Sequence, residues 1–143
     1  MATFNKFYDF VEQLGKGTHQ LHAAGHTLKV ALTNTVPVIT NTVLADITEI
    51  SATAGYTAGG EDSQNTFSES SGTATVVCTD ITWTAVGGNI GPLRYAVWYN
   101  EASAGGLSKP LIGWWDYASS VTIAAGETFK ADFGAGTLTI AWA

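Results

Sequence analysis

Leu93-Arg-Tyr-Ala-Val-Trp-Tyr-Asn100 is the stretch that decides the fold of this chain. Successive side chains of a β-strand point to opposite faces of the sheet. Leucine, valine and two tyrosines occupy the odd-numbered positions and would form one buried face, while the even-numbered positions, Arg94 and Trp98 among them, suggest no reaction centre. The stretch therefore predicts a strand of a rigid, chemically inert β-scaffold.

Similar alternating segments recur along the chain and are separated by turns that contain glycine. They span residues 28–33, 73–78, 81–86, 111–117, 121–124, 128–133 and 137–142. Gly87-Gly88-Asn89 has the composition of a tight hairpin turn, and Gly134-Ala-Gly136 provides another turn. No helical crossovers separate the segments, which argues against a purely parallel sheet. The pattern predicts an all-β fold, an antiparallel β-sandwich or jelly-roll-like barrel of about eight strands with a short N-terminal helix.

The first residues follow a helical period instead. One stripe of a 3.6-residue period holds Phe4, Phe7, Tyr8, Val11 and Leu14. Asn5 would cap this helix and Gly15-Lys16-Gly17 would end it. A helix of about ten residues is not stable alone in water, so it must dock. It either covers an open end of the β-domain or serves as an arm that docks on a neighbouring subunit. We accordingly expect an N-terminal helix or arm with a bridge over residues 1–26, and a β-sandwich domain over residues 27–143.

The composition limits the classes of partner. A chain of 143 residues fits one domain, and only 13% of its residues are charged, against about a quarter in ordinary soluble domains. Such weak charge suggests that a partner covers part of the exterior. The net charge of −6 argues against a nucleic-acid partner. No cluster of lysine and arginine favours a membrane surface, and no apolar run is long enough for a spanning helix.

The single cysteine, Cys78, excludes an intrachain disulfide. The first residues lack the basic and apolar regions of a signal peptide. These two features predict synthesis and assembly in a reducing host cytoplasm. Cys78 lies in an alternating apolar segment, where a buried and unreactive thiol is expected.

Two groups of residues have a chemical alternative to a structural role. His19, His22 and His26 are spaced for a metal site if their segment were helical, but glycines interrupt it and we expect structural or surface histidines. Asp116 lies among aromatic residues, where the pKa of a carboxyl group can rise as a general acid requires. It would need a second carboxylate, for which nothing in the sequence selects a partner. We expect no enzyme activity, no metal and no cofactor.

The chain is rich in tryptophan, with Trp83, Trp98, Trp114, Trp115 and Trp142. Large aromatic side chains dominate both protein cores and protein interfaces. Packing in one of these is the favoured use, and a platform for stacking sugars, as in carbohydrate-binding modules, is the alternative.

Several motifs resemble a family of small structural proteins of tailed bacteriophages. They lie at residues 28–35 (LKVALTNT), 55–60 (GYTAGG), 90–99 (IGPLRYAVWY), 110–117 (PLIGWWDY) and 126–133 (GETFKADF). The similarity extends from about residue 28 to the end of the chain. Proteins of this family occupy places from the capsid surface to the tail or fibre, so the resemblance implies a non-enzymatic role in the virion and supplies no catalytic residues.

The resemblance and the composition together predict a capsid decoration protein that sits on the outer shell of the virion. Its expected partners are the major capsid protein and further copies of itself, with a trimer favoured. The candidate interface residues are Phe4, Phe7, Tyr8, Val11, Leu14, Trp98 and Trp114. The alternative is a tail or fibre module that binds a host glycan through tryptophan and tyrosine faces.

Overall fold

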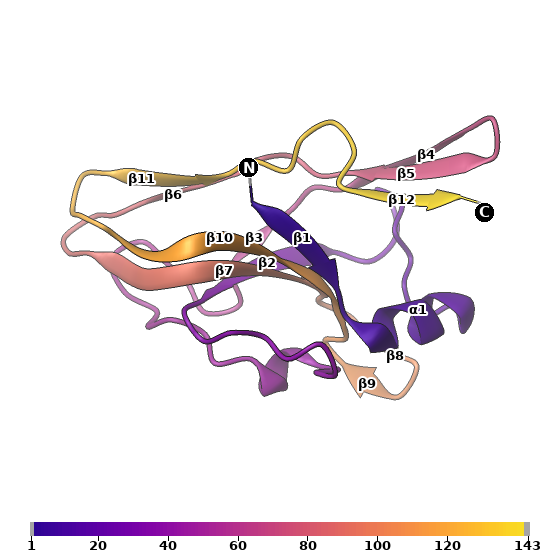
Figure 1. Cartoon of the computed structure of the whole chain (residues 1–143), viewed down its shortest axis with the longest axis horizontal. Coiled ribbons are helices and arrows are strands. Elements are labelled where there is room, and N and C mark those ends of the chain that lie inside the picture. The colour runs from indigo at the N-terminus through magenta and orange to yellow at the C-terminus, as the bar shows by residue number, and fades with distance from the viewer. Residues whose placement is uncertain (1, 142–143) are drawn as a thin grey trace.

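The computed structural model describes residues 2–141, which form antiparallel β-sheets and one short α-helix (Figure 1). The first elements are β1 (Thr3–Lys6), α1 (Tyr8–Gly15), β2 (Leu28–Thr33), the 3-10 turn η1 (Leu44–Asp46), β3 (Glu61–Asp62), β4 (Thr66–Ser70) and β5 (Thr73–Val77). They are followed by β6 (Ile81–Thr84), β7 (Ile90–Asn100), β8 (Ser103–Ala104), β9 (Leu107–Ser108), β10 (Leu111–Ile123), β11 (Thr128–Ala131) and β12 (Leu138–Ala141). The prediction of an all-β, antiparallel fold is confirmed.

A five-stranded sheet with the order β1-β10-β7-β2-β3 forms one layer of the molecule. Two smaller sheets, β11-β6 and β12-β5-β4, lie above it in Figure 1, and β8 and β9 form a separate hairpin. The main hydrophobic cluster fills the space between the layers, where Trp98 and Trp115 of the large sheet meet Trp83 and Val76 of the smaller ones. The sheets are open and do not close into a barrel.

The strand that decides the fold is buried on both faces, not on one. Trp98 and Ala96 of β7 belong to the cluster between the layers. Tyr95, Val97 and Tyr99 belong to a second cluster on the opposite face, which is covered by the chain around η1 and by the residue preceding α1. The central place of β7, paired with β10 on one side and β2 on the other, explains this double burial.

The predicted hairpin at Gly87-Gly88-Asn89 is wrong. β6 precedes this turn and pairs with β11, whereas β7 follows it and pairs with β10 and β2. The turn thus carries the chain from one layer to the other. Gly134-Ala-Gly136 also joins strands of different sheets, since β12 pairs with β5. Turn composition indicates where the chain reverses but not which strands become neighbours.

The predicted helix over residues 4–14 is wrong in its first half. Residues 3–6 form β1, an edge strand paired with β10, and α1 begins at Tyr8 after the N-cap residue Phe7. Phe4 lies opposite Trp115 in the register, with 4.9 Å between the two ring centroids. Gly113 permits this contact, because a Cβ there would lie 2.6 Å from the Phe4 ring. The gain from pairing and aromatic packing on β10 explains why these residues are extended.

Other differences are smaller. Residues 111–117 and 121–124 belong largely to the single long strand β10, with a register shift against β7 between Asp116 and Val121. The segment at 43–50 contains the short turn η1. Trp142, predicted to end the last strand, lies outside the described residues.

Candidate interaction surface

The candidate interface residues divide into buried and exposed groups. Phe7 and Trp98 are fully buried, and Trp114 is 8% exposed. Phe4 and Leu14 are partly buried against the core. Only Tyr8 and Val11 are well exposed, at 67% and 60%.

The apolar stripe expected from the sequence is therefore divided: Phe4, Phe7 and Leu14 contact the interior, whereas Tyr8 and Val11 do not. Phe7 packs on Trp114 at 4.6 Å between ring centroids, and Phe10 contacts the ring of His19 at 5.1 Å. These two phenylalanines fix α1 to the sheet, and the opposite side of the helix, with Tyr8 and Val11, faces outward. Phe10 was not part of the predicted stripe. That stripe included Phe4, which lies in β1 and not in the helix.

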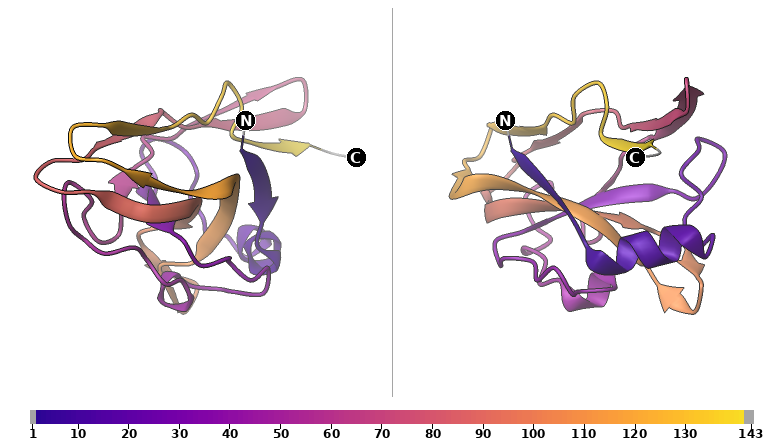
Figure 2. Two further views of the ribbon diagram at one scale, coloured as in Figure 1. Left: turned by 60° about the vertical axis from the view of Figure 1, so that its left-hand side comes forward. Right: turned by 45° about the vertical axis from the view of Figure 1, so that its right-hand side comes forward.

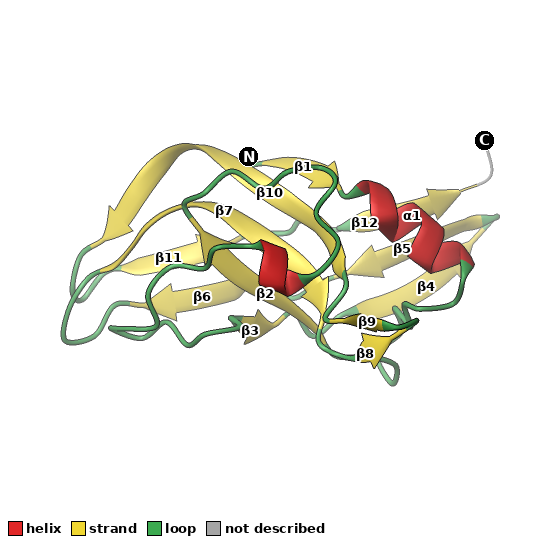
Figure 3. Ribbon diagram, turned by 90° about the horizontal axis from the view of Figure 1, so that it is seen from below, coloured by secondary structure: helices red, strands yellow, loops and turns green. Residues whose placement is uncertain are grey.

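A loop between β2 and η1 extends this exposed surface. The amide of Tyr8 donates a hydrogen bond to the carbonyl oxygen of Ile39 at 3.1 Å, so the loop over residues 34–41 runs beside the start of α1 (Figure 3). Val36 and Val38 are 61% and 54% exposed in this loop. We call Tyr8, Val11, Val36, Val38 and Ile39 the apolar patch.

The loop of the apolar patch is held in a defined shape. Pro37 is buried between the two exposed valines. Asn41 closes the loop through two hydrogen bonds with Val38. The side-chain oxygen of Asn41 accepts from the backbone amide of Val38 at 2.7 Å, and the backbone amide of Asn41 donates to the carbonyl oxygen of Val38 at 2.8 Å. Ordered apolar side chains on the surface are typical of a contact site. The signal in the sequence was the run of apolar residues at 36–39 within an otherwise polar loop.

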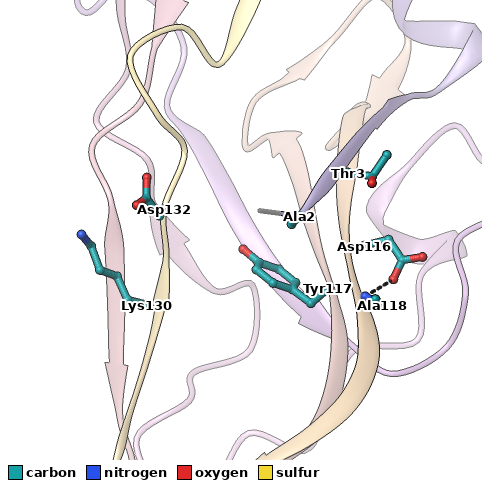
Figure 4. A pocket seen from close by; sticks show the side chains of 7 residues that line it. All are labelled: Ala2, Thr3, Asp116, Tyr117, Ala118, Lys130 and Asp132. Carbon is teal, nitrogen blue, oxygen red and sulfur yellow. Dashed lines mark hydrogen bonds between the residues drawn. The ribbon is translucent and has the colours of Figure 1, made fainter.

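A hollow of about 640 Å³ contains Asp116 and a second carboxylate, Asp132. It is lined by Ala2, Thr3, Asp116, Tyr117, Ala118, Lys130 and Asp132 (Figure 4). Asp116 forms a two-point ion pair with Arg94, at 2.8 and 3.0 Å. This pair lowers the pKa of Asp116, which is opposite to the shift a general acid requires. Lys130 is paired with Asp80 at 2.7 Å.

Tyr117 is the remaining titratable group of that hollow with a shifted pKa. Burial raises its pKa to about 12, and the negative charges of Asp132 and Asp80 add to the effect. The hydroxyl is buried and hydrogen-bonded to no group among residues 2–141. Tyr117 therefore keeps its proton at neutral pH and is no general base there.

The three histidines do not converge on one point. His19 is buried, His26 is half-buried and His22 is exposed. His19 and His26 both contact the side-chain amide of Asn100. Among residues 2–141, no group of three or more histidine, cysteine, aspartate or glutamate side chains is placed to hold a metal ion.

The tryptophans within the described residues lie inside the protein. Trp83, Trp98, Trp114 and Trp115 are each at most 8% exposed. A sugar-stacking platform needs an open aromatic face, which these four rings do not offer. Core packing accounts for their number in this short chain.

Cys78 is buried, as expected, and burial raises the pKa of its thiol. A thiol in this state is protonated and unreactive at neutral pH.

No protein-family model, curated protein or solved structure matches this chain. No α-helix within residues 2–141 has the length and apolar character needed to cross a membrane.

Proposed function

We propose that this chain is a structural protein of a tailed-phage virion, a decoration protein that binds the outer surface of the capsid shell. The observation that carries the proposal is the apolar patch. Helix α1 and the loop over residues 34–41 present it together, and its side chains are more than a third exposed although they are apolar. The resemblance of its sequence motifs to those of phage structural proteins supports the same role.

The architecture suits a covering protein. Its antiparallel sheets enclose a core to which both aromatic and aliphatic side chains contribute, and we propose that they act as a β-sandwich. Such a body is stiff and can hold a small contact surface in a fixed orientation. Because only 13% of the residues are charged, few charged side chains oppose the docking of an apolar partner on the exterior.

The proposed partner is the major capsid protein, bound at the apolar patch. Because one patch of this size binds weakly, we propose that several copies act together, with a trimer favoured. Avidity then multiplies contacts that are individually weak. The proposed location is the capsid surface of the virion after synthesis in the host cytoplasm.

The glycan-binding alternative has less support. Its two named residues, Trp98 and Trp114, are buried in the protein core. Removing either would disturb the fold before it tested sugar binding. The proposal of a shell-binding protein uses side chains that are available on the surface.

The test is binding of the purified protein to empty capsids of the parent phage. Replacement of Tyr8 and Val36 by serine should lower co-sedimentation with capsids at least tenfold, because these are the most exposed apolar side chains of the helix and of the loop that form the patch. Val86→Ser is the matched control, since Val86 is 68% exposed and lies in the turn after β6, outside the patch. Equal binding by both variants and the wild type would contradict the proposal. Imaging of virions that places the protein along the tail would also contradict it.

A further inference from the structure

Asn100, the last residue of β7, holds two histidines of a distant segment. Its side chain is fully buried. The side-chain nitrogen Nδ2 lies 2.8 Å from Nδ1 of His26 and 3.3 Å from Nδ1 of His19. Both histidines belong to the connection between α1 and β2, which is therefore fixed to the end of the central strand.

The orientation of the Asn100 amide is determined by a third contact. Its oxygen Oδ1 accepts a hydrogen bond from the backbone amide of Ala102 at 3.0 Å. The NH₂ group must then face the two imidazole rings and the carbonyl oxygen of Thr18, which lies 3.5 Å from Nδ2. An amide NH₂ only donates, so a ring nitrogen that bonds to it must be an acceptor without a proton. The neutral His19 ring then carries its proton on Nε2, which is buried and bonded to no group within residues 2–141.

We propose that Asn100, His19 and His26 form a pH-sensitive latch, which holds the connection between α1 and β2 on the end of β7 only while the His19 imidazole is neutral. Protonation of the His19 ring places an N–H against the amide NH₂ of Asn100. The two donors then repel each other at a buried site, and the latch opens. The inference does not depend on the role proposed for the apolar patch.

The surroundings of His19 favour the neutral form. Burial, with the ring of Phe10 in contact, is the main cause that lowers the pKa of His19 to about 4, and a charge on His26 contributes to the same shift. Asp9 of α1 acts in the opposite direction. The attraction of the Asp9 carboxylate is therefore too weak to stabilise a charged His19 ring.

The charged groups near His26 are also engaged or open to solvent. Asp62 of β3 lines the same hollow as His26 and is exposed. The carboxylate of Glu101, next to Asn100, accepts from the hydroxyl of Tyr99 at 2.9 Å and pairs with Lys109 at 3.2 Å. Within residues 2–141, neither latch histidine is bonded to a carboxylate.

Opening of the latch should be local. Leu21, between the two histidines, is buried in the main core, and Asn65 donates to its carbonyl oxygen. The amide of Glu101 donates to the carbonyl of Thr27 at 2.9 Å, which holds the end of the connection beside β7. These contacts contain no titratable group that changes between pH 7 and pH 5.

The sign and size of the effect follow from the two states of His19. In the open state its pKa returns towards the ordinary 6.5, while in the closed state it is about 4. The latch is therefore at full strength above pH 6.5 and weakens as the pH falls towards 4. Between pH 7 and pH 5 this shift increases the open-to-closed ratio about 20-fold.

Amide hydrogen exchange measured by NMR tests the latch. The amides of His26 and Gly25 donate to Gln20 and His22 within the closed connection, at 3.1 and 2.9 Å, and report on its opening. After correction for intrinsic exchange chemistry, their protection should fall about 20-fold between pH 7 and pH 5. The amides of β7 should keep their protection, which separates local opening from global unfolding.

Two variants complete the design. The double variant His19→Asn and His26→Asn places a side-chain oxygen near each former Nδ1, so the acceptors remain but cannot be protonated. Its protection should not change between pH 7 and pH 5. His22→Asn removes the exposed histidine of the same connection and should respond to pH like the wild type.

Three results would overturn the proposal. The first is constant protection of the wild-type connection between the two pH values. The second is an unchanged pH response in the double asparagine variant. The third is an NMR titration in which the His19 ring shows the ordinary pKa near 6.5, a measurement that needs no variant.

Discussion

Phe7→Ala should unfold this protein far more readily than Tyr8→Ala, although the two residues are adjacent at the start of α1. Phe7 is fully buried and Tyr8 is 67% exposed. Replacing a buried phenylalanine by alanine typically costs about 3–5 kcal/mol, from lost burial and from the cavity that remains. Part of that cost is the contact with Trp114, because aromatic pairs contribute about 0.5–1.5 kcal/mol beyond their burial. Truncation of an exposed side chain typically changes stability by no more than about 0.5 kcal/mol.

Urea unfolding followed by tryptophan fluorescence measures both variants. With a denaturant dependence of about 2 kcal/mol per molar urea, a loss of 4 kcal/mol lowers the midpoint by about 2 M for Phe7→Ala. Tyr8→Ala should move the midpoint by about 0.25 M or less. Trp114 lies against Phe7, so the native emission should also change in Phe7→Ala. Similar midpoints for the two variants, or a larger loss for Tyr8→Ala, would refute the orientation assigned to α1 and the identity of the apolar patch.

Three further changes probe the interior. Tyr56→Phe should lower the free energy of unfolding by about 1–3 kcal/mol, because the Tyr56 hydroxyl accepts a hydrogen bond from the buried backbone amide of Leu32, at 3.0 Å. An unchanged urea midpoint would contradict this prediction. Gly60→Ala should abolish soluble expression, since the φ of Gly60 is +68° and a Cβ would lie 1.7 Å from a backbone oxygen of β2. Gly72→Ala, with open space around the new Cβ, should lower the free energy of unfolding by only about 1 kcal/mol. Equal yields of the two soluble variants would contradict this prediction. The thiol of Cys78 should react with a thiol reagent at pH 8 only as fast as the protein opens, so rapid labelling of native protein would show that the site is accessible.

The strands themselves were predictable because alternation is a local property of the chain. The segments at 28–33, 73–78 and 93–100 alternate in the sequence and contain β2, β5 and most of β7. A side chain in an extended segment points to one face or the other whatever its neighbours are. The antiparallel arrangement also follows, since short connections cannot join parallel neighbours.

The candidate site was only partly predictable. The sequence directed attention to residues 4–14, and Tyr8 and Val11 of that segment do lie on the surface. Phe7 lies in the interior, and the loop valines of the apolar patch were not selected. A helical period reveals an apolar stripe but not whether a neighbouring strand, here β10, takes its first residues into a sheet.

The latch of Asn100 and two histidines could not be found from spacing. These residues are separated by more than 70 positions, and nothing local marks Asn100 as the partner of His19 or His26. Contacts of this kind arise when β7 and the connection after α1 are brought together by the packing of the sheets.

By itself, the sequence determined that this chain forms short extended segments without a disulfide, since backbone geometry and cysteine count are carried by each stretch separately. Only the tertiary structure decided which strands pair, that β7 is covered on both faces, and which aromatic rings are withdrawn from the surface. The physical reason is that burial depends on the free energy of contacts between distant segments. Local pattern limits those contacts but does not choose among them.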